Sequence, residues 1–225
     1  MLAYHYAILA SRKSMQEQIE KGVRILKNGG VIAFPTDTVY GLGADAFNLR
    51  AVERIYKIKN RPSHLAFPLL IADISQLSIV AQPACGIALL LARRFWPGGL
   101  TLVLPKAISL PSYLAKGSTV AVRIPNHSIC LSLIRGLGAP VIGTSANVSG
   151  NPPALTADEV RQQLGGKVDL IIDGGRCPGS VESTIVDATG ELPLILRQGI
   201  ISLDEIEKAI REYQNSRSAT YCFRL

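Results

Sequence analysis

Residues 29–45, GGVIAFPTDTVYGLGAD, place a short apolar run directly before a cluster of hydroxyls and glycines. Residues 31–34 are typical of a buried strand, and Pro35 ends it because proline cannot donate to a β ladder. Three small polar residues and two glycines follow: Thr36, Asp37, Thr38, Gly41 and Gly43. Ligands of open α/β sheets bind where strands end, and glycines let backbone and ligand approach closely. The stretch therefore predicts part of a binding site.

Composition sets the class of protein. The 225 residues are 48% hydrophobic, which is enough for one sizeable core. The net charge of +7 suits polyanions such as nucleotides or RNA, although scattered Lys and Arg also serve solubility alone. The longest apolar run, residues 87–92, is too short to cross a bilayer, and residues 1–14 lack a secretory signal. We expect a cytoplasmic protein without membrane contact; a short organellar extension is the alternative.

The cysteine pattern gives no reason to expect a metal centre. The chain has four cysteines, none of them at C-x-x-C spacing: Cys85, Cys130, Cys177 and Cys222. A zinc site is therefore not expected, and in a reducing compartment we interpret the cysteines as free thiols.

Alternating helical and strand patterns predict an α/β fold. Capping boxes, in which a hydroxyl and a Glu three residues later satisfy free N–H groups, predict helices starting at Ser14, Thr156 and Ser202. Helical spacing predicts three more, over 49–59, 84–96 and 127–137. Apolar runs predict strands at 31–34, 67–71, 100–104, 119–124, 140–143, 168–172, 183–187 and 193–197. We expect an open, twisted, mixed sheet of parallel and antiparallel strands with helices on its faces.

Polar residues gather in six segments at strand and helix ends: 35–40, 59–63, 118–123, 143–151, 174–184 and 197–199. Loops at the ends of strands converge on one crevice, so these segments predict a polar site for an anionic small molecule. Standard motifs do not explain them. Gly41-x-Gly43 lies too far beyond its strand for a dinucleotide fingerprint, no Walker A loop occurs, and a serine triad around Ser145 lacks support.

Taken singly, each polar candidate has an ordinary explanation. Lys59 and Arg61 could simply stabilise a helix C-terminus, or they could hold phosphate. Ser145 and Asn147 are common turn formers. Arg123, at the end of an alternating strand, could be a solvated outward-facing residue unless a carboxylate faces it.

The motifs together are more specific. In order, they are GGVIAFPTDTVYGLG (29–43), KNRP (59–62), VAVRIP (120–125), SANVSG (145–150), VESTIVD (181–187) and LRQG (196–199). This set, over about residues 14–210, resembles the YrdC-like threonylcarbamoyl-AMP synthases. The resemblance implies a YrdC-like sheet with a basic central cleft and a catalytic domain at 14–210. It leaves an N-terminal extension at 1–13 and a C-terminal tail at 211–225, as in the family's short, single-domain form.

The resemblance also implies an activity. These enzymes are nucleotidyltransferases (L-threonylcarbamoyladenylate synthases) that join L-threonine, bicarbonate and ATP, with Mg²⁺, into threonylcarbamoyl-AMP and pyrophosphate. A threonylcarbamoyl transferase complex then modifies tRNA with the product. Whether this chain contacts tRNA directly stays open at this point.

Roles carry over to matching positions. The resemblance implies Lys59 and Arg61 as catalytic residues. It implies as ATP ligands Lys59, Arg61, Thr119, Ser145, Asn147 and Arg197. It implies as threonine ligands Thr36, Arg123, Gly143 and Ser183. No protein side chain is expected to hold a metal by itself, and Mg–ATP is expected near Ser145 and Asn147.

One segment departs from the family pattern. Residues 63–69 read SHLAFPL where the family often has Asn-Pro-Leu, so the sequence does not predict how this segment closes over the substrates.

Two other functions are alternatives. The main alternative is a non-catalytic module that binds tRNA or double-stranded RNA in a basic cleft. A nicotinamide-dependent oxidoreductase would depend on Gly41-x-Gly43 alone.

Overall fold

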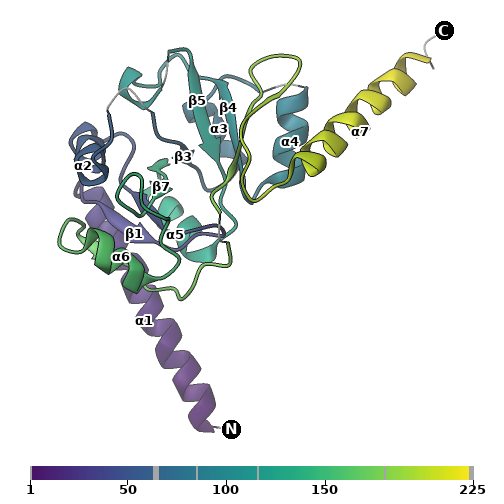
Figure 1. The fold of residues 1–225 in the computed structure, drawn as a ribbon. Helices are drawn as coiled ribbons and strands as arrows, with labels where there is room; N and C mark the ends of the chain where they lie inside the picture. Colours follow the sequence, from purple (N-terminus) through teal and green to yellow (C-terminus); the bar gives the residue numbers. More distant parts are fainter. Residues whose placement is uncertain (1, 63–65, 85, 116, 180, 223–225) are drawn as a thin grey trace.

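The computed structural model describes residues 2–62, 66–84, 86–115, 117–179 and 181–222, and within them the side chains of residues 13–214. Figure 1 shows a body of strands and short helices from which a long helix projects at each end of the chain. The helices are α1 (Leu2–Lys27), α2 (Leu49–Lys59), α3 (Leu77–Val80), α4 (Ile87–Phe95), α5 (Ser128–Leu137), α6 (Ala157–Leu164) and α7 (Leu203–Cys222).

The described strands form two sheets. They are β1 (Ile32–Phe34), β2 (Gly41–Gly43), β3 (Leu69–Leu70), β4 (Leu100–Pro105), β5 (Thr119–Arg123), β6 (Val141–Ile142), β7 (Thr144–Ser145), β8 (Leu170–Ile171), β9 (Thr184–Asp187) and β10 (Leu194–Arg197). One sheet has the order β7-β2-β1-β8, and the other has the order β10-β9-β4-β5-β3-β6. Pairs β1–β8, β3–β5 and β4–β9 are parallel and the other pairs are antiparallel. The expected mixed character is confirmed.

The division into two sheets was not expected from the sequence. An antiparallel bridge between Asp45 and Val141 joins them, because the chain leaving β2 runs beside β6. The N–H of Ile142 donates to the carbonyl of Ala44 across this junction, at 2.9 Å. The two sheets are therefore connected at the point where β2 and β6 meet.

The opening stretch folds back on itself. β1 pairs antiparallel with β2, Ile32 opposite Gly43 and Phe34 opposite Gly41, so residues 35–40 form the connection. Tyr40 is fully buried and its hydroxyl donates to the Gly175 carbonyl at 2.8 Å. β2 was not predicted as a strand because its sequence, Gly-Leu-Gly, has low β propensity and no alternation.

Two of the three predicted capping boxes are confirmed. Thr156 Oγ1 accepts from the Glu159 N–H at 3.2 Å, and Ser202 Oγ accepts from the Glu205 N–H at 3.3 Å. The prediction that Ser14 starts a helix is wrong, because α1 already runs from Leu2. No glycine or proline precedes Ser14 to stop a helix from continuing upstream.

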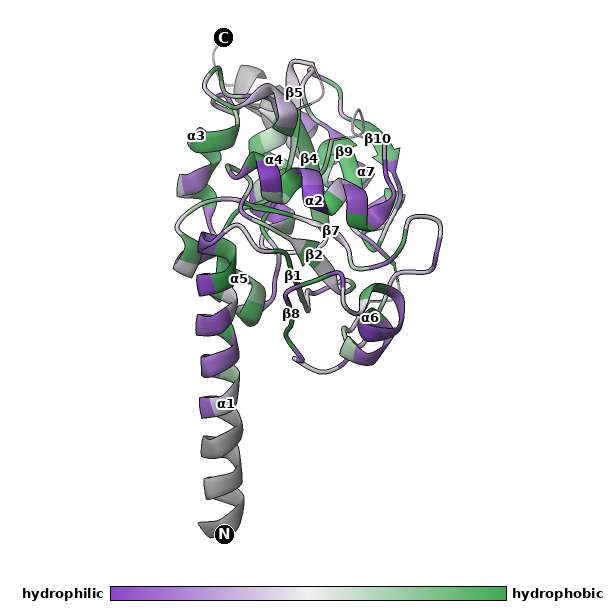
Figure 2. Cartoon of the chain, turned by 90° about the vertical axis from the view of Figure 1, so that its left-hand side faces the viewer, coloured by the Kyte–Doolittle hydropathy of each residue, from purple (hydrophilic) through white to green (hydrophobic). Residues whose placement is uncertain are grey.

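The core is apolar and is formed by buried side chains from the strands of both sheets and from the helices that pack on them. Figure 2 shows hydrophobic residues along strands within the body and stretches of hydrophilic residues along helices such as α1 and α6. A second apolar cluster lies beneath α1 and α5, which approach so closely that a Cβ on Gly136 would lie 2.6 Å from Val23 Cγ2. The predicted domain limits at 13/14 and 210/211 fall inside α1 and α7, so the division itself stays a prediction. Within the part of the chain described here, no helix has the length and apolar character needed to span a membrane.

The glycines of β2 predict a stability effect. A Cβ at Gly43 would lie 2.7 Å from the Ile142 carbonyl oxygen and 2.8 Å from Phe34 Cε1. We expect Gly43→Ala to lower the free energy of unfolding by about 1–3 kcal/mol, because overpacking displaces backbone. Gly190→Ala is the matched control, since its Cβ would meet only the Leu192 carbonyl oxygen, at 3.9 Å. Urea unfolding measures both, and equal stabilities would contradict the tight β2–β6 junction.

Candidate functional site

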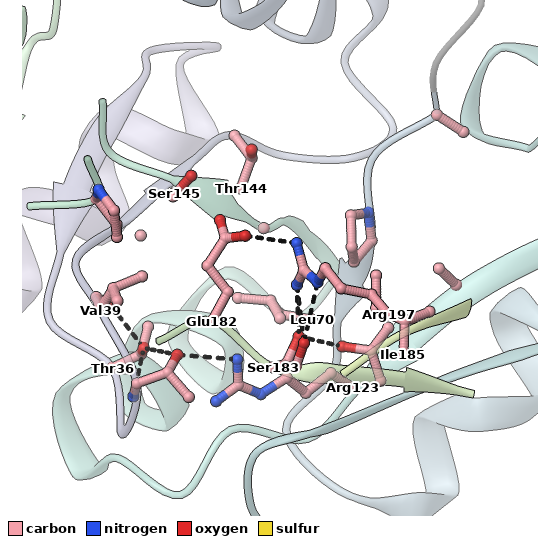
Figure 3. Close-up of a pocket in the computed structure, with 18 of the residues that line it drawn as sticks. Thr36, Val39, Leu70, Arg123, Thr144, Ser145, Glu182, Ser183, Ile185 and Arg197 are labelled. Carbon is pink, nitrogen blue, oxygen red and sulfur yellow. Dashed lines mark hydrogen bonds and ion pairs between the residues drawn. The ribbon is translucent and has the colours of Figure 1, made fainter. Parts of the chain in front are cut away.

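A cavity of about 810 Å³ is lined by residues of both sheets. Figure 3 shows side chains from the loop after β1, from β5, from β7 and from the start of β9 pointing into it. The structure brings together in this cavity all ten predicted site residues: Thr36, Lys59, Arg61, Thr119, Arg123, Gly143, Ser145, Asn147, Ser183 and Arg197. Their separate roles remain predictions.

Arg123 is buried at the end of β5 and bonded to the loop after β1. Its Nη2 lies 2.7 Å from Asp37 Oδ1, its Nη1 donates to Thr38 Oγ1 at 3.1 Å, and its Nε donates to the Gly98 carbonyl at 2.9 Å. The interpretation as a solvated, outward-facing residue is wrong, since Arg123 is only 6% exposed. A guanidinium has five N–H donors, so these bonds leave two for a ligand.

Small hydroxyls line the cavity together with this guanidinium. Thr36 Oγ1 donates to the Val39 carbonyl at 2.6 Å and lies 3.0 Å from Thr38 Oγ1. Ser183 Oγ lies 2.8 Å from Thr101 Oγ1. Thr36 and Ser183 were predicted, whereas Thr38 and Thr101 were not. This part of the cavity can hold a small molecule that has both a carboxylate and hydrogen-bonding groups.

Lys59, the last residue of α2, is buried and fully hydrogen-bonded. Its Nζ donates to the Ser145 carbonyl at 2.6 Å, the Asn147 carbonyl at 3.0 Å and Asn147 Oδ1 at 2.9 Å. Burial lowers the pKa of Lys59 to about 8, with Glu182 acting in the opposite sense. Lys59 is 2% exposed, so it is no ordinary solvated cation at a helix end.

Arg61 differs from the other cavity cations. Its guanidinium carbon lies 4.9 Å from the centre of the Phe67 ring, in a cation–π contact. Its Nε is buried without a hydrogen-bond partner in the described part of the chain. A buried guanidinium N–H without a partner is costly, so an incoming anion would bind favourably here.

Arg197 is held against the start of β9. Its Nε and Nη2 donate to the Ser183 carbonyl at 3.2 and 2.9 Å, and its Nη1 pairs with the Glu182 carboxylate (Figure 3). Sequence reasoning missed Glu182, although its place beside Ser183 in VEST was a signal. Glu182 and Asp187 are the acidic members of the cavity wall, so the expected basic character of the cleft stays a prediction.

The remaining predicted residues line the same cavity. Asn147 Nδ2 donates to the Asn151 carbonyl at 2.6 Å, and Ser145 belongs to β7. Gly143 packs on Leu70, where a Cβ would lie 2.5 Å from Leu70 Cγ, so a larger residue does not fit. Thr119 begins β5.

The described residues include two buried free thiols and no cluster of potential metal ligands. No group of three or more His, Cys, Asp or Glu that could hold a metal ion occurs within these ranges. Cys130 and Cys177 are free and buried, as expected for thiols, while Cys85 lies outside the described residues. The cavity instead offers cations and hydroxyls, which can orient two anions beside each other.

Comparison with known proteins identifies the family. The family model Sua5/YciO/YrdC, described as telomere recombination, matches residues 24–199. A threonylcarbamoyl-AMP synthase of Pyrococcus abyssi is 44% identical over 207 residues, covering 91% of this chain and 61% of the relative. One of Bacillus subtilis is 45% identical over 196 residues, covering 86% of this chain and 56% of the relative. The chain thus spans little more than half the length of these relatives.

A solved structure gives the same result. The structure of Pyrococcus abyssi Sua5 complexed with L-threonine superposes with a TM-score of 0.82 at 44% identity, covering 85% of this chain and 57% of that one. The family match includes all ten predicted site residues, from Thr36 to Arg197. The chain therefore belongs to the Sua5/YciO/YrdC family.

Proposed function

We propose that this chain is an L-threonylcarbamoyladenylate synthase, a nucleotidyltransferase that makes threonylcarbamoyl-AMP and pyrophosphate from L-threonine, bicarbonate and ATP. The observation that carries the proposal is one cavity that contains buried hydroxyls and two arginines with N–H groups available to a ligand, Arg61 and Arg123. The names of the Pyrococcus and Bacillus relatives support the same activity.

Threonine is proposed to occupy the Arg123 side of the cavity. Its carboxylate would bind the two N–H groups of Arg123 that do not take part in the bonds to Asp37, Thr38 and Gly98. Thr36 and Ser183, 4% and 6% exposed, would bind its polar groups, and the Gly143 carbonyl is a further acceptor. The L-threonine complex of the Pyrococcus protein supports an amino-acid site in this fold.

ATP is proposed to occupy the side formed by Arg61, Ser145 and Arg197, with Thr119 and Asn147 nearby. Arg61 is the residue suited to the phosphates, because its buried Nε has no acceptor in the described chain. Mg²⁺ would enter with ATP as part of the substrate, held mainly by phosphate and water oxygens. Asn147 Oδ1 is a poor metal ligand in this arrangement, since it accepts from the Lys59 ammonium.

The proposed reaction needs orientation more than covalent chemistry. The threonine amine and bicarbonate condense to a carbamate with loss of water. A carbamate oxygen then attacks the α-phosphorus of ATP in line, and pyrophosphate leaves. Both reactants are anions, so fixed cations and donors reduce their repulsion and align them. Arg123 would hold the amino acid, and Arg61 would stabilise charge on the departing pyrophosphate.

Beyond the reaction, the proposal includes the use of the product. A threonylcarbamoyl transferase complex would move the group to tRNA, and the cytoplasm is the predicted location. Direct tRNA contact is a separate question. A non-catalytic RNA-binding module would need surface cations but no buried hydroxyl cluster at Thr36, Thr101 and Ser183, so this alternative is not favoured.

Pyrophosphate release tests the reaction. With Mg–ATP, we expect release only when L-threonine and bicarbonate are both present, because the carbamate is the nucleophile. Mass spectrometry of the same mixture should show threonylcarbamoyl-AMP. Release from ATP alone, or none by the folded protein, would reject the synthase proposal.

Substitution of Arg123 separates the two subsites. We expect Arg123→Ala to raise the KM for threonine by about 10- to 100-fold and the KM for ATP much less, since a hydrogen bond to a charged group contributes about 1.5–3 kcal/mol. Arg211→Ala, which removes an exposed arginine of α7, is the matched control and should change neither. Because loss of Arg123 also leaves Asp37 unpaired, unfolding is measured in parallel. A larger effect on ATP than on threonine would move Arg123 to the nucleotide side.

A further inference from the structure

Exposed apolar side chains gather at one edge of the six-stranded sheet. Within the described part of the chain, six of the eleven large hydrophobic residues that are exposed belong to residues 181–203: Val181, Leu192, Leu194, Leu196, Ile200 and Leu203. β10 is the outermost strand of this sheet, and Figure 2 shows it beside β9 as a mostly hydrophobic strand. Exposed apolar side chains that gather in this way typically mark an interaction site.

Three leucines form a strip along β10, which we call the leucine strip. Leu192, Leu194 and Leu196 are 75%, 63% and 53% exposed, whereas Pro193 and Ile195 between them are less exposed. Ile195 packs against the core. The exposure therefore alternates as it does in a strand with one buried face, and the leucines point away from the core.

The leucine strip begins at the rim of the cavity. Leu194 stands opposite Asp187 of β9, and Leu196 lines the cavity together with Asp187. The strip thus continues the cavity-lining face of the sheet outward to its edge. Leu192 and Leu194 are not among the cavity-lining residues, so they are available to a partner while a substrate occupies the cavity.

The edge of β10 is poorly suited to adding another strand. Pro193 has no backbone N–H, and the register with β9 shifts between Ile195 and Arg197, as at a β-bulge. Proline and bulges are features that block strand addition at sheet edges. A partner of this surface would therefore bind through the leucine side chains rather than by extending the sheet.

The same segment is acidic in a basic chain. Residues 181–207 include six of the 17 acidic residues and one of the 24 basic ones, a formal charge of −5 in a chain of +7. The one base, Arg197, pairs with Glu182. Glu191, next to the leucine strip, and Asp204, next to Leu203, are exposed and have no ion-pair partner among the described residues. The apolar side chains thus have uncompensated negative charge beside them.

We propose that the leucine strip is a docking surface for a protein segment that presents apolar side chains flanked by Lys or Arg. Charge complementarity selects this occupant, because a basic flank would pair with Glu191 and Asp204 while the leucines are buried. A nucleic-acid backbone would be repelled by the acidic residues. A second copy docked by a two-fold axis would place these residues against themselves. The inference goes beyond the proposed function and does not depend on the reaction.

A designed peptide tests the surface in the unmutated protein. The probe is a helical peptide of about 15 residues, with leucine on one face and lysine on the other. We expect it to shift the backbone amide signals of residues 191–197 and to bind more weakly as salt rises. A peptide of the same pattern with glutamate in place of lysine should not bind.

Substitutions locate the contact. We expect Leu194→Ser to weaken binding of the leucine–lysine peptide by about tenfold or more, since an apolar anchor is lost. Glu191→Lys should weaken it as well, because the charge is reversed. Ile108→Ser is the matched control, as it removes an isoleucine that is 93% exposed and lies outside the segment, and it should change nothing.

Several outcomes would overturn the proposal. They are equal binding of the glutamate peptide, amide shifts confined to residues outside 181–203, and unchanged affinity in folded Leu194→Ser. Sedimentation of the protein alone tests the other occupant. Self-association that Leu194→Ser abolishes would make a second copy the partner and contradict the proposed chemistry. The shift mapping needs no variant, so it decides the case if Leu194→Ser does not fold.

Discussion

The buried guanidinium of Arg123 is the constraint on which the site depends. A buried charge is tolerated only when it is paired and hydrogen-bonded, and loss of one partner typically costs about 3–5 kcal/mol. Arg123 comes from β5 of the six-stranded sheet, whereas Asp37 and Thr38 come from the loop after β1 of the four-stranded sheet. One ion pair therefore links the two sheets where the cavity lies. Gly98, just before β4, completes the set of acceptors.

The same principle organises the rest of the cavity. Lys59 and Arg197 are also bonded to protein oxygens before any ligand arrives, Lys59 to the 145–151 turn and Arg197 to Glu182 and Ser183. Fixed groups need no reorganisation when substrates bind, which is the main source of electrostatic catalysis. Arg61 differs, because its buried Nε has no hydrogen-bond partner among the described residues and its guanidinium carbon lies over the Phe67 ring. The cavity thus combines cations that are already bonded to the protein with N–H groups of Arg61 and Arg123 that remain available to a ligand.

The sequence predicted which residues form the site better than it predicted the hydrogen bonds and ion pairs among them. Ordered motifs identified ten residues that line one cavity, and helical spacing gave α2 with its observed bounds. The partners of these residues were missed because they are distant in the chain, as Asp37 is from Arg123, and no local pattern encodes such a pair. β2 and β7 were missed because two glycines or two hydroxyl residues carry no hydrophobic alternation, so tertiary pairing alone makes them strands. The predicted helix start at Ser14 was wrong, because a residue suited to capping does not start a helix when the residues before it are themselves helical.

The central claim is that one cavity between the two sheets binds the amino acid and the nucleotide side by side. The most direct measurement is a crystal structure of the protein with L-threonine and a non-hydrolysable ATP analogue. The account predicts the threonine carboxylate on Arg123 and the phosphates against Arg61 and Ser145, with the threonine amine facing the α-phosphate. Either ligand bound outside this cavity, or the two bound too far apart for one carbamate to bridge them, would contradict it.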